Sequence, residues 1–318
     1  MGKINVGIIG TGGIGERVLN AFQAHPDTEV LGAFDGNADR LAEISEKYGI
    51  AAAEDYKELF DNPDINLIYI AVPPKFHHQF VTEALRSNKN VLCEKPLAST
   101  VAEADEMLAA ATSRGLIHAV NFPTVFGGGF LELERLAGDG FLGDLRRVEL
   151  HCHFEEWPRK WQQNSWISSR EQGGFVREVF PHYIQIILHL FGKISDIHSS
   201  LELPDNPELC ETGIIANGRL SNGVPVLFNG LSGIGMKEEL RFDLFGTEGT
   251  LSLRNWSELW AGRKNEPLQR VETDVSNSYQ VFIEELVNAF EGKPSRIVSF
   301  QRGRDVQEVL DQLLGAED

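Results

Sequence analysis

Residues 4–15 read Ile-Asn-Val-Gly-Ile-Ile-Gly-Thr-Gly-Gly-Ile-Gly, an apolar run that ends in the glycine pattern Gly10-x-Gly12-x-x-Gly15. The run predicts a buried strand, and the apolar residues at helical spacing beyond it predict a helix. In such a unit the first glycine allows a tight turn, the second lets a pyrophosphate approach, and the third lets the helix pack on the strand. Unpaired N–H groups at the helix start attract phosphates. The segment predicts a dinucleotide site, with cofactor contacts at Gly10, Thr11, Gly12, Gly13 and Ile14.

A second apolar run ends in Asp35, twenty residues after Gly15. A carboxylate at the end of the second strand accepts hydrogen bonds from the adenosine ribose and repels a 2′-phosphate, so Asp35 favours NAD over NADP. The alternative is a turn residue, because Asp35-Gly36-Asn37 is itself a turn sequence. Arg40 could meet a phosphate, but its place inside the next helix favours a solvated side chain.

Composition and charge restrict the class of protein. The chain has 318 residues and a net charge of −18, which suits neither a nucleic-acid backbone nor an anionic membrane. No apolar run approaches the roughly 18 to 20 residues of a membrane span. A core strand begins within three residues of Met1, so no signal peptide is expected. The cysteines are odd in number and widely spaced, which favours reduced thiols and a cytoplasmic protein, and they lie at Cys93, Cys152 and Cys210.

Residues 1–121 alternate between helical and strand patterns. Further strands are predicted at residues 50–53, 66–72, 90–93 and 116–121. Between them, capping patterns at Asp55-x-x-Glu58 and Thr100-x-x-Glu103 predict helix starts. Such alternation predicts a doubly wound α/β domain with a parallel sheet, and its ligand should lie at the carboxyl ends of the strands.

Residues 122–318 have a different texture, typical of an α+β domain. Alternating apolar and polar residues predict strands of a large, mostly antiparallel sheet at 145–154, 194–201, 212–220, 224–231, 239–245 and 250–253. Helices are expected near residues 131–136 and at 175–190, 279–290 and 303–314. The last two helices are candidates to pack back on the first domain.

Several motifs resemble those of the glucose-fructose oxidoreductase / inositol dehydrogenase (Gfo/Idh/MocA) family. They are Ala71-Val72-Pro73-Pro74-x-x-His77, Asn90-Val91-Leu92-Cys93-Glu94-Lys95-Pro96-Leu97-Ala98, Phe245-Gly246-Thr247-Glu248-Gly249-Thr250-Leu251 and Gly292-Lys293-Pro294. The resemblance implies a Rossmann domain followed by an open-faced sheet domain, with nicotinamide bound between them. It also implies homo-oligomers that form through the open face of the sheet.

Lys95 is the first candidate for catalysis, because it follows a strand at the edge where the nicotinamide should arrive. Its ammonium could hydrogen-bond the substrate hydroxyl and polarise the corresponding carbonyl. The alternative is an ordinary exposed Glu-Lys pair. A cis bond before Pro96 is a further hypothesis. The resemblance directs Glu94 to the nicotinamide ribose, and the remaining cofactor contacts are expected at Val72, Pro73, Pro74, His77, Lys95 and Asn121.

A second catalytic element is expected at Glu178 and His182, one helical turn apart after Gly173-Gly174. Relatives usually have glycines, then an Asp, and a His four residues later. We interpret His182 as the general base, with Glu178 orienting it. The alternative is a histidine at a helix start that solvent or a neighbouring carboxylate satisfies. Glu178 replaces an Asp, and two further departures, Phe180 for a glycine and Gln185 for an acid, predict an altered pocket.

The remaining candidates carry weaker signals. His151 and His153 share one face of a strand, but no acidic or cysteine partner is visibly fixed nearby, so no metal is predicted and packing is favoured. The loop rich in Trp, Arg and Lys at residues 157–170 suits binding of a sugar, or alternatively closes a core or a subunit edge. Residues 127–129 suggest a mobile pocket wall. Substrate contacts are expected at Lys95, Phe122, Trp166, Arg170 and His182.

The sequence thus predicts an enzyme that transfers hydride between NAD and a secondary alcohol of a sugar, cyclitol or related polyol. Two alternatives stay open. One is a relative that retains NAD and uses transient oxidation for elimination or glycoside cleavage. The other is a nucleotide-binding regulator without turnover. The substrate is not fixed by the sequence, because selectivity depends on loops of the second domain.

Overall fold

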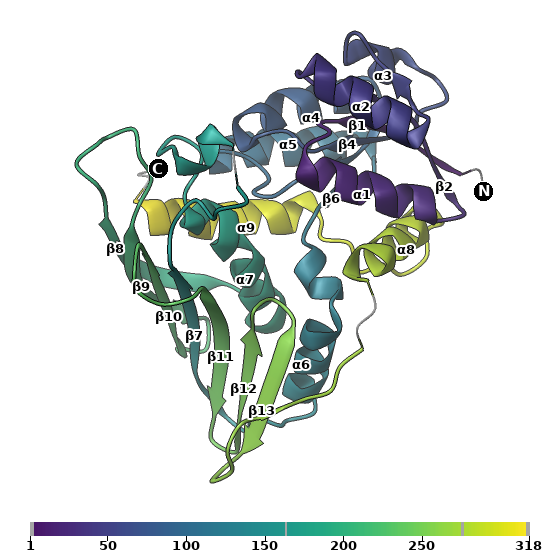
Figure 1. Cartoon of the computed structure of the whole chain (residues 1–318). Coiled ribbons are helices and arrows are strands. Elements are labelled where there is room, and N and C mark those ends of the chain that lie inside the picture. Colours follow the sequence, from purple (N-terminus) through teal and green to yellow (C-terminus); the bar gives the residue numbers. More distant parts are fainter. Residues whose placement is uncertain (1–2, 163, 275–276, 316–318) are drawn as a thin grey trace. The chain divides into compact units, whose positions relative to one another are not determined.

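The computed structural model describes residues 3–162, 164–274 and 277–315. By their contacts, the residues form two compact units. Unit 1 comprises residues 1–123 and 279–304, and unit 2 comprises residues 124–278 and 305–318. The closing helices are therefore divided between the units. Each unit is considered by itself (Figure 1).

Unit 1 contains a six-stranded parallel sheet in the order β3-β2-β1-β4-β5-β6. The strand order reverses between β1 and β4, which is where open α/β sheets bind ligands. This confirms the predicted doubly wound sheet. Its strands are β1 (Ile4–Ile9), β2 (Thr28–Phe34), β3 (Ala51–Ala52), β4 (Leu67–Ile70), β5 (Asn90–Cys93) and β6 (His118–Val120).

Unit 1 also contains helices, and all but the last of them, which lies near the end of the chain, connect these strands. They are α1 (Gly13–Ala24), α2 (Ala38–Tyr48), α3 (Lys57–Asp61), the 3-10 turn η1 (Pro74–Phe76), α4 (His77–Arg86), α5 (Val101–Arg114) and α8 (Ser278–Phe290). The capping pattern at α5 is confirmed, since Glu103 N–H donates to Thr100 Oγ1 at 3.2 Å. Ser99 N–H donates in return to the Glu103 carboxylate at 2.9 Å. Satisfying these groups fixes where the helix begins.

Unit 2 contains an eight-stranded sheet in the order β14-β13-β12-β11-β7-β10-β9-β8. Apart from the parallel pair β10–β7, its neighbours are antiparallel, as predicted. Its strands are β7 (Leu145–Phe154), β8 (Ile194–Glu202), β9 (Gly213–Leu220), β10 (Pro225–Ser232), β11 (Glu239–Gly246), β12 (Gly249–Arg254), β13 (Glu258–Arg263) and β14 (Gln269–Arg270). The sequence did not predict β13 and β14, which are short and lack a sustained alternation.

Helices cover one face of this sheet (Figure 1). Its helical segments are η2 (Pro123–Phe126), α6 (Gly128–Gly138), η3 (Ser165–Ser168), α7 (Phe175–Phe191) and the later part of α9 (Phe300–Leu314). Residues of β7 alternate between fully buried positions toward the helices and half-buried or exposed positions on the opposite face. Strand β9 shows the same alternation. The sheet therefore has one covered face and one more open face.

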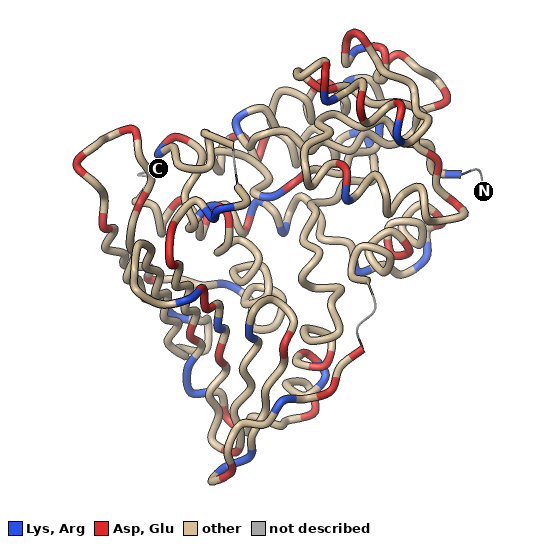
Figure 2. Tube along the Cα trace, in the orientation of Figure 1, with Lys and Arg blue, Asp and Glu red and all other residues tan. Residues whose placement is uncertain are grey.

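Charged residues occur along the backbone of both units (Figure 2), and acidic residues outnumber basic ones. Among the described residues, no helix combines the length and apolar character that crossing a membrane would require.

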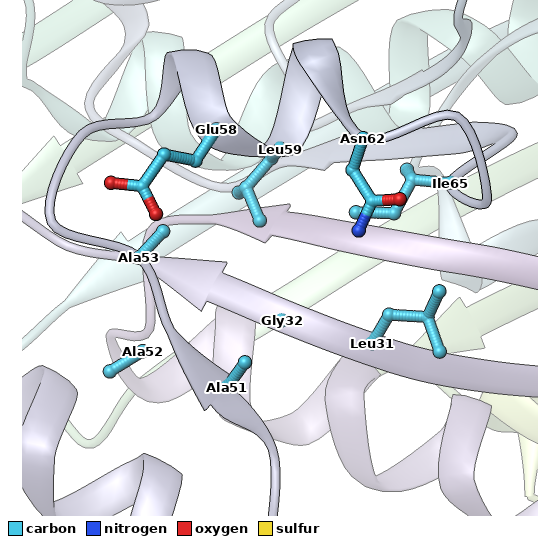
Figure 3. A pocket seen from close by; sticks show the side chains of 9 residues that line it. All are labelled: Leu31, Gly32, Ala51, Ala52, Ala53, Glu58, Leu59, Asn62 and Ile65. Atoms are coloured by element: carbon cyan, nitrogen blue, oxygen red, sulfur yellow. The ribbon is translucent and has the colours of Figure 1, made fainter.

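A pocket in unit 1 lies between α3, the edge strand β3 and its neighbour β2 (Figure 3). Glu58 on its rim accepts a hydrogen bond from Asp55 N–H at 3.0 Å. None of the predicted site residues lines this pocket, whose walls are formed by Leu31, Gly32, Ala51, Ala52, Ala53, Glu58, Leu59, Asn62 and Ile65.

Candidate functional site

The glycines after β1 have the properties that a phosphate-binding turn requires. Gly10 has a φ of +97°, and a Cβ there would lie 2.4 Å from the carbonyl oxygen of Ala71. A Cβ at Gly15 would lie 2.1 Å from the carbonyl oxygen of Gly10, so only glycine lets α1 pack so closely. Around Gly12 and Gly13, by contrast, a Cβ would meet nothing within 4 Å. This leaves an open cradle at the start of α1 that suits a pyrophosphate.

Asp35 is tied to the glycine turn through Thr11. Thr11 N–H and Oγ1 donate to Asp35 Oδ2 at 2.6 and 2.8 Å. The other carboxylate oxygen accepts from Asn37 N–H at 2.8 Å, which is the turn contact that the sequence offered as an alternative. Asp35 therefore both closes its own turn and fixes the end of β2 beside the glycine turn.

Arg40 differs from the expectation of a solvated side chain. Its Nε donates to the carbonyl oxygen of Thr11 at 2.9 Å. Its side chain is 25% exposed and also forms ion pairs with Glu16 and Glu43. The prediction was wrong because a helix position says nothing of a long side chain that reaches back across the preceding turn.

His77 connects the segments that follow β4 and β5. The imidazole is fully buried, with Nδ1 at 2.9 Å from the carbonyl oxygen of Pro96 and Nε2 at 2.9 Å from that of Val72. Burial lowers the pKa of His77 and favours the neutral ring, which can donate to only one of these carbonyls at a time. In this structure His77 links the loop after β4, which contains Pro73 and Pro74, to the loop after β5.

Glu94, Tyr69 and Asn121 form a polar cluster at the carboxyl ends of β4, β5 and β6. Glu94 Oε1 accepts from Tyr69 Oη at 2.6 Å and from Asn121 Nδ2 at 2.5 Å. Burial raises the pKa of Glu94 and opposes its ionisation. The Asn121 side-chain oxygen is buried and has no hydrogen-bond partner within the described chain. An acceptor left unpaired at this edge suits a ligand that donates a hydrogen bond.

Lys95 lies directly after β5 in the same unit. The Lys95–Pro96 peptide bond is cis, which confirms the hypothesis drawn from the sequence. Lys95 is half-buried, as is Glu94 before it.

In unit 2, a residue that the sequence analysis missed organises the start of α7. Glu211 is 3% exposed, and its Oε1 accepts from Val176 N–H at 2.8 Å. Gly174 has a φ of +97°, and a Cβ there would lie 2.3 Å from Glu211 Oε2. The carboxylate thus caps the helix from a loop far along the chain. No local pattern could reveal this, because capping motifs place the capping side chain next to its own helix.

His182 lies within α7, with 9% of its surface exposed. Its Nδ1 is 3.3 Å from Thr124 Oγ1. The imidazole packs edge-on against Trp256, with ring centroids 5.2 Å apart. Glu178 is half-buried one turn earlier on the helix. His182 is therefore held by its neighbours and largely buried, which argues against the solvent-exposed form of the alternative. Thr124 and Trp256 are neighbours that the sequence did not identify.

Comparison with known proteins gives the family. Residues 4–122 match the model of an oxidoreductase family with an NAD-binding Rossmann fold. Residues 130–252 match the model of the GFO/IDH/MocA C-terminal domain. The chain belongs to the Gfo/Idh/MocA family. It is an oxidoreductase whose Rossmann domain binds NAD, consistent with the open glycine cradle.

Two curated relatives illustrate the similarity. The chain is 26% identical over 254 residues to a dTDP-3,4-didehydro-2,6-dideoxy-alpha-D-glucose 3-reductase of Streptomyces antibioticus, covering 79% of this chain and 75% of the relative. It is 24% identical over 259 residues to an uncharacterized oxidoreductase of Bacillus subtilis, covering 80% and 74%.

Solved structures share the fold over nearly the whole chain. A levoglucosan dehydrogenase in complex with NADH and L-sorbose has a TM-score of 0.89 at 20% identity, covering 99% of this chain and 97% of that one. A UDP-N-acetylglucosamine 3-dehydrogenase from Acidithiobacillus ferrooxidans has a TM-score of 0.84 at 20% identity, covering 99% and 98%.

Two residues of α7 that depart from the Gfo/Idh/MocA pattern, Phe180 and Gln185, are buried. Phe180 is fully buried and stacks on Phe228 of β10, with ring centroids 6.0 Å apart. It fills the helix–sheet core, so the expectation that it alters a pocket was wrong. Gln185 is 3% exposed, and its side-chain oxygen has no hydrogen-bond partner in the part of the chain described here.

The segment at residues 127–129 also differs from its prediction as a mobile wall. Gly128 and Gly129 begin α6. A Cβ at Gly128 would lie 2.0 Å from the carbonyl oxygen of Asp274, and one at Gly129 would lie 2.1 Å from that of Ser257. These glycines allow backbone to pack closely on backbone.

The predicted substrate contacts have varied surroundings. The Arg170 guanidinium donates to the carbonyl oxygens of Leu209, Pro204 and Asn206 at 2.9 to 3.3 Å, so it holds a loop. Trp166 is half-buried within η3. Phe122 is 1% exposed in unit 1. A substrate role for these residues stays a prediction.

The histidines of β7 have acidic neighbours that the sequence did not reveal. His151 Nε2 is 2.9 Å from Glu149 Oε2, and Asp243 on the adjacent strand β11 contributes a third potential metal ligand within 4.8 Å. The carboxylates are already paired, since Glu149 binds Arg147 at 3.2 Å and Asp243 binds Arg241 at 2.7 Å. Both carboxylates of this group are therefore paired with arginine side chains.

Proposed function

We propose that this protein transfers hydride between NAD and a secondary alcohol of a sugar, cyclitol or related polyol. The proposal rests on one combination of features. This chain has the glycine turn of an NAD-binding oxidoreductase family, and its helix α7 holds a largely buried imidazole, His182. The names of similar proteins support the substrate class, since they include a dTDP-sugar 3-reductase and a levoglucosan dehydrogenase.

The residue roles follow from their chemistry. Bound NAD supplies or accepts the hydride. We propose that His182 accepts the hydroxyl proton, with Thr124 Oγ1 beside Nδ1 helping to fix the ring, and that Glu178 adds negative charge from the preceding turn. We assign Lys95 as the hydrogen-bond donor to the reacting oxygen. If Lys95 and His182 serve one hydroxyl, their mutational effects are coupled.

Binding of NAD is expected to involve the glycine turn, Asp35 and the polar residues after β4, β5 and β6. Donors from the nicotinamide half suit the unpaired oxygen of Asn121, and Glu94 remains the proposed contact to the nicotinamide ribose. We also propose that the protein is cytoplasmic. We further propose that it assembles into homo-oligomers through the open face of the unit 2 sheet, and sedimentation of the purified protein measures its oligomeric state.

The test is a screen of the purified protein with NAD and a panel of sugars, cyclitols and polyols, with ketoses and NADH for the reverse direction. We expect NADH absorbance to change with at least one substrate. Lys95→Met should remove this turnover while NADH still binds. Binding of NADH without turnover in either direction would instead support the regulator. Conversion of a substrate without net NADH, together with NAD released on denaturation, would support a retained cofactor.

A further inference from the structure

Arg40 is the basic side chain that the structure fixes beside the glycine turn. Thr11 connects it to Asp35, because the Thr11 N–H donates to Asp35 while the Thr11 carbonyl oxygen accepts from Arg40 Nε at 2.9 Å. Arginine near this position is the residue type that accommodates the 2′-phosphate of NADP. The chain thus carries a group with the chemistry to bind NADP, next to the carboxylate that favours NAD.

Each of the three nitrogens of this guanidinium already donates a hydrogen bond. Besides Nε, one terminal nitrogen donates to Glu43 at 2.8 Å and the other donates to Glu16. Glu16 also accepts from Lys47 Nζ at 2.6 Å and from Tyr48 Oη at 3.0 Å. A phosphate would therefore have to displace carboxylates that are already in place.

The positive charges of this network are fully compensated. Glu16 and Glu43 compensate Arg40 and Lys47, and Asp35 then leaves one negative charge in excess. The hydrogen bonds from Lys47 and Arg40 lower the pKa of Glu16 to about 2, so this carboxylate remains charged at neutral pH. A 2′-phosphate would meet repulsion from Asp35, and the guanidinium that could offset it is already paired with two carboxylates.

We propose that Glu43 and Glu16 help to exclude NADP by sequestering Arg40, as a second layer of discrimination behind Asp35. Removing Asp35 alone then lowers the affinity for NADH without producing a site for NADPH. Removing the charge of Glu43 as well makes one terminal nitrogen of Arg40 available to the phosphate. The inference depends on the dinucleotide site and not on the proposed reaction, so an inactive protein that binds NADH still tests it.

The experiment titrates NADH and NADPH into the full chain and follows quenching of tryptophan fluorescence. The variants are Asp35→Ser, Glu43→Gln, their combination, and the combination with Arg40→Gln. Glu43 is 61% exposed, so its substitution is expected to leave the fold intact, and thermal unfolding of each variant checks this. Glu46→Gln is the matched control, because Glu46 is an exposed carboxylate on the same helix.

We expect Asp35→Ser to bind NADPH little better than the parent protein. Adding Glu43→Gln should tighten NADPH binding by about ten-fold, the size of one charge-assisted hydrogen bond. Arg40→Gln should cancel this gain, and Glu46→Gln should produce none. The proposal is overturned if Asp35→Ser alone gives the full NADPH affinity, if Glu46→Gln matches Glu43→Gln, or if the gain survives Arg40→Gln.

Discussion

The glycine turn after β1 and the helix α7 both contain predicted site residues, but the protein holds them in different ways. The turn is shaped by backbone contacts, such as the close approach of Gly15 to the carbonyl oxygen of Gly10. In α7 the environment of His182 comes from Thr124 and Trp256, which lie far away in the sequence. A site formed by backbone can thus be predicted from a short stretch of sequence. A site formed by side chains from distant segments depends on the tertiary fold.

This contrast also affects what substitutions should do. A Cβ in the turn meets either a carbonyl oxygen or open space, depending on the glycine. Side chains on α7 are either packed into the sheet, as Phe180 is, or held by a few polar and aromatic neighbours, as His182 is. Substitutions can therefore separate stability, cofactor binding and catalysis.

The largest effect is expected for His182→Ala. Loss of the proposed general base should lower kcat by about 10² to 10⁴-fold, with NADH affinity little changed. His189→Ala is the matched control, because His189 lies on the same helix with its side chain 39% exposed. Turnover that stays unchanged at every pH would remove His182 from the mechanism and leave it as a packing residue beside Trp256.

Phe180→Ala is expected to reduce stability and leave the chemistry alone. Removing a fully buried ring that stacks on Phe228 should lower the free energy of unfolding by about 3 to 5 kcal/mol. Chemical denaturation measures this loss, and NADH titration at low temperature should give the parent affinity. An unchanged stability with a new substrate preference would instead return Phe180 to the pocket that the sequence suggested.

These cases show which parts of the molecule the sequence could predict. Strands at residues 90–93 and 145–154 match β5 and β7 residue for residue, because each combines a clear apolar pattern with turn residues at its ends. The sequence could not predict which way the Phe180 side chain points, because α7 is buried on nearly all sides and its apolar residues mark no single face. Glu211, which caps α7, and Arg40, which reaches back to Thr11, act through contacts between distant residues.

The two classes of glycine in the turn can be separated by a pair of variants. Gly15→Ala would place a Cβ 2.1 Å from a backbone carbonyl oxygen, and should lower the free energy of unfolding by about 2 to 3 kcal/mol. Gly12→Ala meets open space, so we expect the parent melting temperature but weaker NADH binding. If Gly12→Ala bound NADH as the parent does, the open cradle would not be the phosphate site.

The smallest effect concerns Glu16, whose carboxylate joins α1 to Arg40 and Lys47. Its pKa is lowered in the folded protein from 4.5 to about 2. A lowered folded pKa means that its contribution to stability is present above the unfolded pKa and is lost as the pH falls toward the folded value. Because Glu16 is partly solvated, we expect Glu16→Gln to cost about 1 kcal/mol at neutral pH. Denaturant unfolding at several pH values should show this difference shrinking between pH 4.5 and 2, and a difference independent of pH would mean that Glu16 acts through packing alone.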